Sequence, residues 1–269
     1  MRNNFSARSK LIYKGAATYF IYGWNRNDLL IDALAGYDFG KVGMLTGNFS
    51  YQLKEAPFIY ESFHYFPQSW TYDLPKTKIM TIGGKYQNIP YGITADVNYH
   101  VADHLPVYPG KASPYVTTGV ENIFVFHAAN RHSVVGLHFD NDVWYTYTTT
   151  NGYVRQTYPR LVTRSSIYYE NRLFKKALWF SLGVDLRYRY PNNAPYYDPF
   201  LGAFYPTYTT NKSSPILDIF LNVKIKTVRI FLKVDNLTSA LGGKGYYSAY
   251  QYPAADVSFK GGVRWRFYE

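Results

Sequence analysis

The chain has 269 residues, a formal net charge of +11, no cysteine and an aromatic content of 20%, with 30 Tyr, 18 Phe and 5 Trp. Without cysteine, disulfide bridges and thiolate metal sites are excluded. The cations are spread singly and form no run that would follow a phosphate backbone, so we expect no nucleic acid among the partners. A soluble core rarely uses so much tyrosine, because every buried hydroxyl needs a partner, whereas tyrosine suits a bilayer interface.

The N-terminal segment, MRNNFSARSKLIYKGAATYF, does not have the pattern of a signal peptide. Lys14 interrupts its apolar run, and no small-residue cleavage site follows. No stretch of the chain contains the roughly 18 consecutive apolar residues of a transmembrane helix. We therefore expect either that a leader has been removed or that the chain has been cut from a longer one.

The first half of the chain alternates apolar and polar residues over short segments. Alternation with a period of two places successive side chains on opposite faces of a β-strand. Within 119–130 the assignment of faces is ambiguous, because Ile123 and Val125 compete with Phe124 and Phe126. The predicted strands of this half are 11–21, 29–37, 45–51, 80–86, 93–101 and 119–130, with 59–72 as a possible further strand.

The second half alternates more clearly. In ALWFSLGVDLRYRY (177–190) the apolar set runs without a break from Leu178 to Tyr190, which exceeds a typical strand of about five or six residues. It is long enough for the roughly 9–11 residues of a tilted strand that crosses hydrocarbon. The predicted strands of this half are 135–139, 161–169, 177–190, 216–226, 228–235 and 257–268. The whole pattern predicts about 12–14 strands and shows no apolar stripe with a helical period.

The connections between these strands alternate in length from residue 88 onward. Outer-membrane barrels have this rhythm, because their periplasmic turns are short and their outside loops are long. We therefore predict an all-β fold: an antiparallel transmembrane β-barrel of the outer-membrane type, forming one domain over residues 1–269, with its C-terminus in the periplasm. The predicted short turns are 88–91, 130–132, 174–176 and 226–227, and the predicted long loops are 102–114, 149–159, 191–215 and 236–256.

The later segments also resemble a known family. YYENRLFKKALWFSLGVDLRYRY, APYYDPFLGAFYPT, SSPILDIFLNVKIKTVRIFLKVDNLT and the closing VSFKGGVRWRFYE are similar to the C-terminal part of the β-barrel porins of Bacteroidota outer membranes, as is 57–87. Members of that family are about twice as long, so the resemblance implies that the chain is the C-terminal part of a larger barrel. The DNLT at 235–238 also resembles the last strands of TonB-dependent receptors.

The histidines and carboxylates do not predict a catalytic or metal site. His127, His132 and His138 are close in sequence, but we expect His127 and His132 to flank a turn, with no carboxylate at ligand spacing beside them. Asp96, His100, Asp103 and His104 could form a hydrolase constellation, yet no serine nucleophile or second acidic pair accompanies them. We expect no enzyme activity, metal or cofactor.

The cations on the polar strand faces form the candidate functional set. They outnumber the carboxylates of the same faces, Glu170, Asp185, Asp218 and Asp235, so in a water-filled lumen they would favour anionic solutes. The alternative is that some of them contact headgroups or pair across strands, as we expect for Lys226 and Arg266. The candidate lumen-lining residues are Arg164, Arg187, Arg189, Lys224, Arg229, Lys233, Lys260 and Arg264.

The apolar faces of the last strands are predicted to meet outer-membrane lipid. In the closing strand we place Trp265 and Phe267 at the periplasmic interface, Phe267 toward lipid and Tyr268 toward the lumen. The segment resembles the aromatic-ended final strand that barrel-assembly machinery recognises, although Tyr268 and Glu269 follow Phe267. The predicted lipid-facing set is Leu217, Ile219, Leu221, Val223, Val228, Ile230, Leu232, Val234, Val257, Phe259 and Val263.

Three functions remain open at this point. The first is an outer-membrane porin-like channel for the passive passage of small polar, in particular anionic, solutes. The second is a structural or accessory barrel of a secretion or surface-protein complex with a blocked lumen, and the third is the C-terminal part of a TonB-dependent receptor barrel. The loop 191–215 could fold inward as a constriction or outward as a docking surface.

Overall fold

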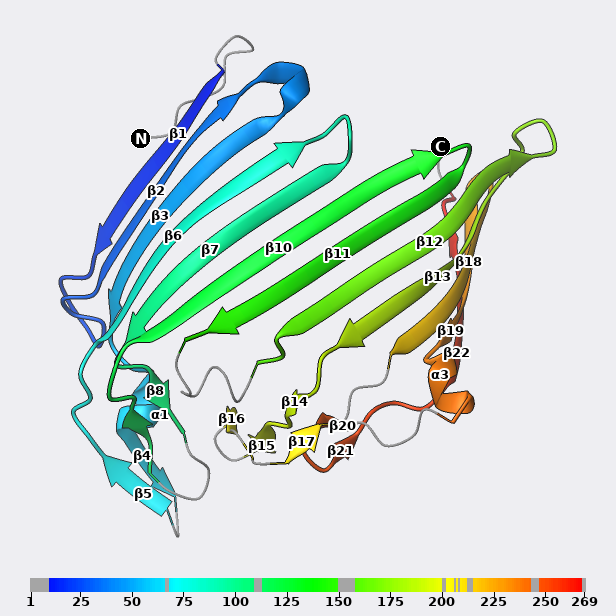
Figure 1. Ribbon diagram of the computed structural model, residues 1–269. Helices are drawn as coiled ribbons and strands as arrows, with labels where there is room; N and C mark the ends of the chain where they lie inside the picture. Colours follow the sequence, from blue (N-terminus) through cyan, green and yellow to red (C-terminus); the bar gives the residue numbers. More distant parts are fainter. Residues whose placement is uncertain are drawn as a thin grey trace.

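The computed structural model is built around one curved antiparallel sheet of twelve strands (Figure 1). It describes residues 10–65, 68–108, 113–149, 158–199, 202–205, 207, 209–211, 215–242 and 247–267. The strands of the sheet are β1 (Leu11–Tyr19), β2 (Leu29–Asp38), β3 (Met44–Lys54), β6 (Thr77–Asn88), β7 (Ile93–Asp103), β10 (Glu121–Val134), β11 (Leu137–Thr148), β12 (Leu161–Leu173), β13 (Leu178–Arg189), β18 (Ile216–Ile225), β19 (Val228–Asp235) and β22 (Ser258–Trp265).

Each strand of this sheet pairs with the next strand of the sheet along the chain, so the sheet is an up-and-down meander. The connections at one end are short turns, and those at the other end are long loops. Small hairpins and helices lie in the long loops: α1 (Phe58–Glu61), β4 (Ser62–Tyr65), β5 (Gln68–Thr71), β8 (Pro106–Val107), β9 (Tyr115–Val116), β14 (Asn192–Asn193), β15 (Tyr196–Asp198), β16 (Ala203–Tyr205), β17 (Thr210–Asn211), α3 (Leu237–Ala240), β20 (Tyr247–Ala249) and β21 (Tyr252–Pro253). A short 3-10 turn, η1 (Gly40–Val42), joins β2 to β3.

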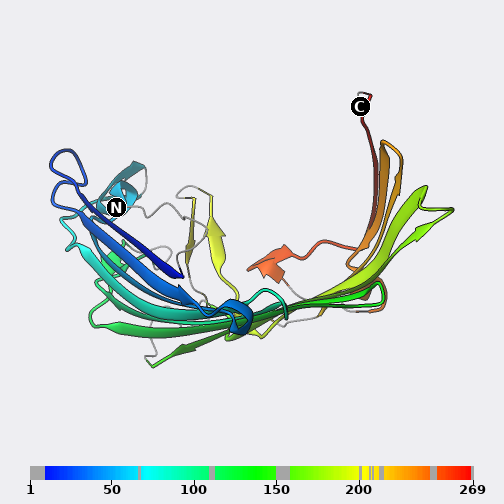
Figure 2. The ribbon, with the colours of Figure 1, turned by 90° about the horizontal axis from the view of Figure 1, so that it is seen from above.

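The sheet does not close into a barrel. β1 and β22 are its two edges, and in the part of the chain that the structure describes each pairs with a single neighbour. Figure 2 shows the result, a curved sheet whose two edge strands lie far apart on either side of its open concave face. The segments 11–19 and 258–265 are therefore not hydrogen-bonded to each other.

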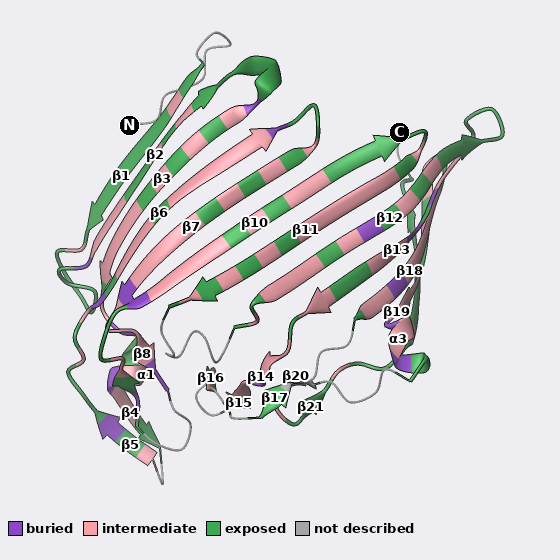
Figure 3. Cartoon of the chain, viewed as in Figure 1, coloured by how far each residue is buried: buried purple, intermediate pink, exposed green. Residues whose placement is uncertain are grey.

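The two faces of the sheet differ in chemistry as the alternation predicts. Residues that lie directly opposite in adjacent strands share a face, and the register places most of the large apolar residues on one face and most of the charged residues on the other. In β7 the apolar Ile93 and Val97 are exposed, whereas the polar Thr94 and Asp96 between them are partly buried. Curvature explains this contrast, which recurs along the strands in Figure 3, because side chains crowd together on a concave face and spread apart on a convex one. The polar face is thus the concave face.

The sheet has no apolar core of its own. The buried apolar residues lie at its long-loop end and in the loops there: Ala56, Trp70, Ala102, Val107, Tyr108 and Ala194. Large apolar side chains on the convex face are exposed, as Leu182 (50% exposed), Phe259 (72%) and Val263 (69%) illustrate. The hydrophobic residues of the strands therefore need an apolar surrounding outside the sheet. The predicted lipid-facing set lies on this convex face, apart from Val257, which precedes β22.

The described part of the loop 191–215 lies beyond the long-loop end of the strands (Figure 1), and seen from above it falls within the outline of the curved sheet (Figure 2). The Tyr108 hydroxyl donates a hydrogen bond to Asp198 over 3.2 Å, and the Tyr108 and Tyr205 rings lie 5.8 Å apart. The Tyr196 ring also lies 6.0 Å from that of Tyr250, and the Tyr250 N–H donates to the Pro195 carbonyl over 2.8 Å. Of the two orientations that the sequence left open, the described part of this loop adopts the inward one.

Two sequence predictions are wrong in detail. Residues 59–72 do not form a strand of the main sheet but supply part of α1 and the separate hairpin β4–β5. Residues 130–132 are not a turn, since β10 continues to Val134 and the reversal is made by Val135 and Gly136, both with positive φ. Such a pair forms the tight hairpin turn whose twist matches that of the strands. The longest helices among the described residues have four residues, and no helix there is long and apolar enough to cross a membrane.

Candidate functional site: the concave polar face

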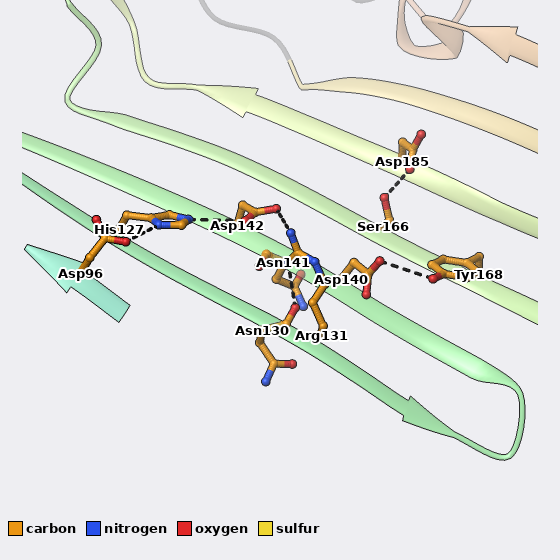
Figure 4. Close-up of polar contacts among 10 residues, drawn as sticks. All are labelled: Asp96, His127, Asn130, Arg131, Asp140, Asn141, Asp142, Ser166, Tyr168 and Asp185. Atoms are coloured by element: carbon orange, nitrogen blue, oxygen red, sulfur yellow. Dashed lines mark hydrogen bonds and ion pairs between the residues drawn. The ribbon is translucent and has the colours of Figure 1, made fainter. Parts of the chain in front are cut away.

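A chain of polar contacts crosses the middle of the concave face from β7 to β11 (Figure 4). His127 of β10 lies between two carboxylates, with Nδ1 2.8 Å from Asp96 Oδ1 and Nε2 3.4 Å from Asp142 Oδ1. Arg131, four residues further along β10 and on the same face, contacts Asp142 through Nη2 at 2.6 Å. The register brings these residues together, because Asp96 lies opposite His127 and Asp142 opposite Ala129.

Tyrosine and serine hydroxyls continue the network on β12. Tyr168 donates to Asp140 over 3.4 Å, and its ring stacks on that of His138 with centroids 4.7 Å apart. Ser166 donates a short hydrogen bond to Asp185 of β13. The carboxylates of this part of the face therefore have partners on neighbouring strands, which hold their side chains in place.

Asp218 of β18 is the centre of a second group of contacts. Its side chain is only 1% exposed, and it lies 2.6 Å from Arg187 Nη2 and 2.9 Å from Lys233 Nζ. Its Oδ1 accepts a hydrogen bond of 2.8 Å from the N–H of Asn236, the left-handed residue that precedes α3. Asp235 lies 2.8 Å from Lys233 and also contacts Lys260. Three of the candidate cations, Arg187, Lys233 and Lys260, are thus paired with two carboxylates, which leaves one net positive charge in this group.

A row of cations at the short-turn end of this face contains no such carboxylate. Arg172 of β12 lies opposite Trp179 of β13, Trp179 opposite Lys224 of β18, Lys224 opposite Arg229 of β19, and Arg229 opposite Arg264 of β22. We call these five residues the basic rung. Each of them lies one residue inside the end of its strand. A hollow of about 640 Å³ opens beside the rung, lined by Arg172, Lys176, Trp179, Lys224, Lys226 and Arg229.

The remaining candidate cations, Arg164 and Arg189, lie on the same face, further from the short turns than the basic rung. Arg164 lies opposite Asp142 on one side and Arg187 on the other, and it forms no ion pair among the described residues. Arg189 lies opposite Val162 near the long-loop end of β13. Sequence reasoning did not include Arg172, because it ended this strand at residue 169, whereas β12 continues to Leu173.

The histidines are placed differently from the prediction. His127 and His132 do not flank a turn, since both belong to β10, and the carboxylates absent from the neighbouring sequence come from β7 and β11. His100 contacts the Thr81 hydroxyl at 2.9 Å, and His104 lies 3.0 Å from Asp103, so these residues do not gather with Asp96. Among the described residues no group of three or more His, Asp and Glu side chains could hold a metal ion. Tyr268 and Glu269 lie outside the described residues.

A polar concave face on an antiparallel meander with an apolar, exposed convex face defines the wall of a membrane β-barrel. The family model described as "Putative porin" matches residues 2–269, and the chain belongs to that family. It is an outer-membrane β-barrel protein. No curated protein matches the sequence.

Two solved structures illustrate the similarity in fold. The FrpB iron transporter from Neisseria meningitidis (F3-3 variant) is 13% identical with a TM-score of 0.50, over 88% of this chain and 44% of its own. BauA, the ferric preacinetobactin receptor from Acinetobacter baumannii, is 12% identical with a TM-score of 0.53, over 87% of this chain and 35% of its own. The chain therefore spans less than half the length of either structure.

Proposed function

We propose that the chain forms part of the wall of a porin channel through which small polar solutes, anionic ones favoured, pass without energy input. The membership of the porin family supports a channel. The observation that carries the preference for anions is the basic rung, in which Arg172, Lys224, Arg229 and Arg264 lie side by side on the concave face without a carboxylate in their row.

The charge balance along the face supports the same conclusion. Arg187, Lys233 and Lys260 are paired with Asp218 and Asp235, which leaves one net positive charge, so this group adds less to the potential of a lumen than the four cations of the basic rung. The basic rung lies six residues further along each strand than Asp218, about 20 Å at the rise of a strand. This separation exceeds the screening length of about 8 Å at physiological salt, so these carboxylates leave the rung positive. A positive rim concentrates anions at the mouth of a pore.

The proposal includes a larger barrel. Among the described residues the edge strands β1 and β22 each pair with a single neighbouring strand, and a membrane does not tolerate an open sheet edge unless another strand covers it. The chain also covers less than half the length of the solved structures of similar fold. We propose that further strands of the same barrel complete the sheet, so that the chain supplies part of its wall.

A second candidate is the C-terminal part of a TonB-dependent receptor barrel, in which a plug closes the lumen. The similarity in fold to an iron transporter and a ferric preacinetobactin receptor favours this candidate. The hairpin β15–β16, which contacts Tyr108 beyond the long-loop end of the strands, would suit an accessory barrel with a blocked lumen.

Conductance of the full-length protein in a planar bilayer distinguishes these candidates. A passive channel gives unitary current steps without added ligand or energy source, and liposomes that contain the protein swell in small uncharged sugars. A barrel that is plugged or serves a complex folds and inserts, but it gives no current steps in the bilayer and no swelling of liposomes. That result would overturn the proposed channel function.

A further inference from the structure

We propose that the basic rung and its hollow form a binding site for a phosphate-bearing organic anion with a flat apolar group, near the short-turn mouth of the channel. The inference deepens the proposed function, on which it rests, by naming the class of solute. It is carried by four features of the rung: its uncompensated charge, its regular spacing, the tryptophan within it and the space beside it.

The adjacent positive charges of the rung destabilise the sheet when no anion is bound. Residues directly opposite in adjacent strands have Cβ atoms about 5 Å apart, and like charges in such positions repel each other. Lys224 faces Arg229, and Arg229 faces Arg264, so three cations follow one another across β18, β19 and β22. A dianion placed between two of them would remove this repulsion. A phosphate ester is such a dianion near neutral pH, and Arg binds phosphate through paired N–H donors.

The next row toward the long loops supplies a single carboxylate. Its residues are Glu170, Ser181, Asn222, Phe231 and Gly262. Glu170 is two residues from Arg172 on β12, at the opposite end of the row from the cations of β18, β19 and β22, and it lies 3.7 Å from His138. Of the described residues that line the hollow, none is acidic. The cations are exposed and directed to a space that an anion can enter.

Trp179 gives the site a second recognition element. It lies between Arg172 and Lys224 in the rung and lines the hollow, and its side chain is partly exposed. Among the described residues its ring makes no contact with another aromatic ring, in contrast to Trp144, which stacks on His127 with centroids 4.8 Å apart. An open indole face beside cations suits the flat apolar part of a ligand whose phosphate contacts the cations.

The same phosphate chemistry could come from a lipid headgroup at the membrane surface. The position of the rung favours a solute, because its side chains lie on the concave polar face, whereas lipid chains would cover the convex face that carries Val263 and Trp265. The test therefore includes a lipid arm that separates the two sources.

Isothermal titration of the full-length protein in an uncharged detergent with phenyl phosphate tests the site. We expect saturable binding that weakens at least tenfold in Lys224→Gln/Arg229→Gln and is unchanged in Lys41→Gln/Arg160→Gln, which removes the same charge from exposed positions away from the rung. Trp179→Leu should weaken the binding of phenyl phosphate at least threefold and leave that of methyl phosphate unchanged. Phosphatidylglycerol added to the micelles should not displace phenyl phosphate.

Three results would overturn the inference. These are the absence of saturable binding, equal weakening in the two double variants, and displacement by phosphatidylglycerol, which would assign the rung to lipid. Heat-modifiable mobility of each variant shows whether it folds. Because the titration needs no current, a silent bilayer with intact binding would contradict the channel function alone, and an open channel without binding would contradict the site alone.

Discussion

Lys224 and Arg229 lie directly opposite each other on the concave face, on strands joined by the turn at Lys226 and Thr227. Two cations in this position repel each other, and the next strand adds Arg264 to the same row rather than a carboxylate. A sheet selected for stability alone would place an acid at one of these positions. The unfavourable row is the strongest indication in the fold that this end of the concave face serves an anion.

The repulsion predicts that Lys224→Glu stabilises the protein. The new carboxylate lies between Trp179 and Arg229 and gains an ion pair in place of a like-charge contact, with an expected gain of about 0.5 kcal/mol for exposed groups. Urea unfolding of the full-length protein in detergent measures the difference. Lys41→Glu, in the turn between β2 and β3, is the matched control and should have no effect. A loss of stability in Lys224→Glu would contradict the repulsive arrangement.

The two faces of β18 predict opposite tolerance to charge. Leu221 lies on the convex face opposite Leu182 and Leu232, whereas its neighbour Asn222 lies on the concave face opposite Ser181 and Phe231. We expect Leu221→Arg to cost on the order of 2–4 kcal/mol, the penalty for a cation near the middle of a bilayer, and Asn222→Arg to cost little. A refolding titration into lipid vesicles measures both variants. Equal costs would show that the lipid-facing side is misassigned.

Asp218 is expected to be the carboxylate of this face that tolerates substitution least. Its removal leaves Arg187 and Lys233 without their shared partner and frees the N–H of Asn236. Asp218→Ala should cost about 1.5–3 kcal/mol, as expected for the loss of hydrogen bonds to a charged group whose partners, Arg187 and Lys233, keep access to solvent. Asp218→Asn, which keeps an acceptor for Asn236, should cost less.

The control for Asp218 is Asp185 in the same row, which accepts a hydrogen bond from Ser166. Asp185→Ala should cost about 1 kcal/mol, as expected for a single hydrogen bond. Protease cleavage in the segment 236–256 provides a second measurement, because the contact between Asp218 and Asn236 holds the start of that loop. Unchanged cleavage in Asp218→Ala would contradict this anchoring role.

Glu61 in the long loop between β3 and β6 predicts a pH dependence of stability. Burial raises the pKa of its carboxyl, and the negative charges of Glu55 and Asp73 raise it further. A raised pKa in the folded state means that ionisation opposes folding, so this cost is absent below the ordinary value of 4.5 and grows as the pH rises above it. Glu61→Gln should therefore raise the melting temperature at pH 8 and leave it unchanged at pH 4.

Asp28 provides a control with the opposite sign. It lies 2.5 Å from Lys76, whose pKa is raised because hydrogen bonds to Asp28 and Glu55 outweigh the effect of burial. Asp28→Asn removes half of an ion pair and should lower the melting temperature at pH 8. If Glu61→Gln also lowers the melting temperature at pH 8, the charge of Glu61 is not what opposes folding.

The period-two alternation predicted the strands of the sheet because side-chain direction in a strand follows directly from sequence. It could not identify the turn at Val135 and Gly136, since the polar residues 130–132 resemble a turn and the deciding feature is a pair of positive φ angles. The same limit explains the error at 59–72, where the apolar residues pack in a loop hairpin rather than face a membrane. Trp70 is 6% exposed and its indole N–H donates to the Ile59 carbonyl.

The contacts of the concave face depended on register and were not predictable from one sequence. Asp96 and His127 are 31 positions apart and meet only because β7 pairs with β10 in one particular register. The basic rung is a similar case, since Arg172 and Arg264 belong to strands that are not neighbours. Sequence reasoning identified most of its cations from their faces, but the row itself follows from the pairing of five strands.

The reversal potential of the full-length protein in a planar bilayer under a potassium chloride gradient tests the central claim most directly. A channel with the basic rung at its mouth should favour chloride over potassium, and Lys224→Gln/Arg229→Gln should reduce this preference, whereas Lys41→Gln/Arg160→Gln should not. An open channel that favours potassium, or one whose anion preference is unchanged in Lys224→Gln/Arg229→Gln, would contradict the account.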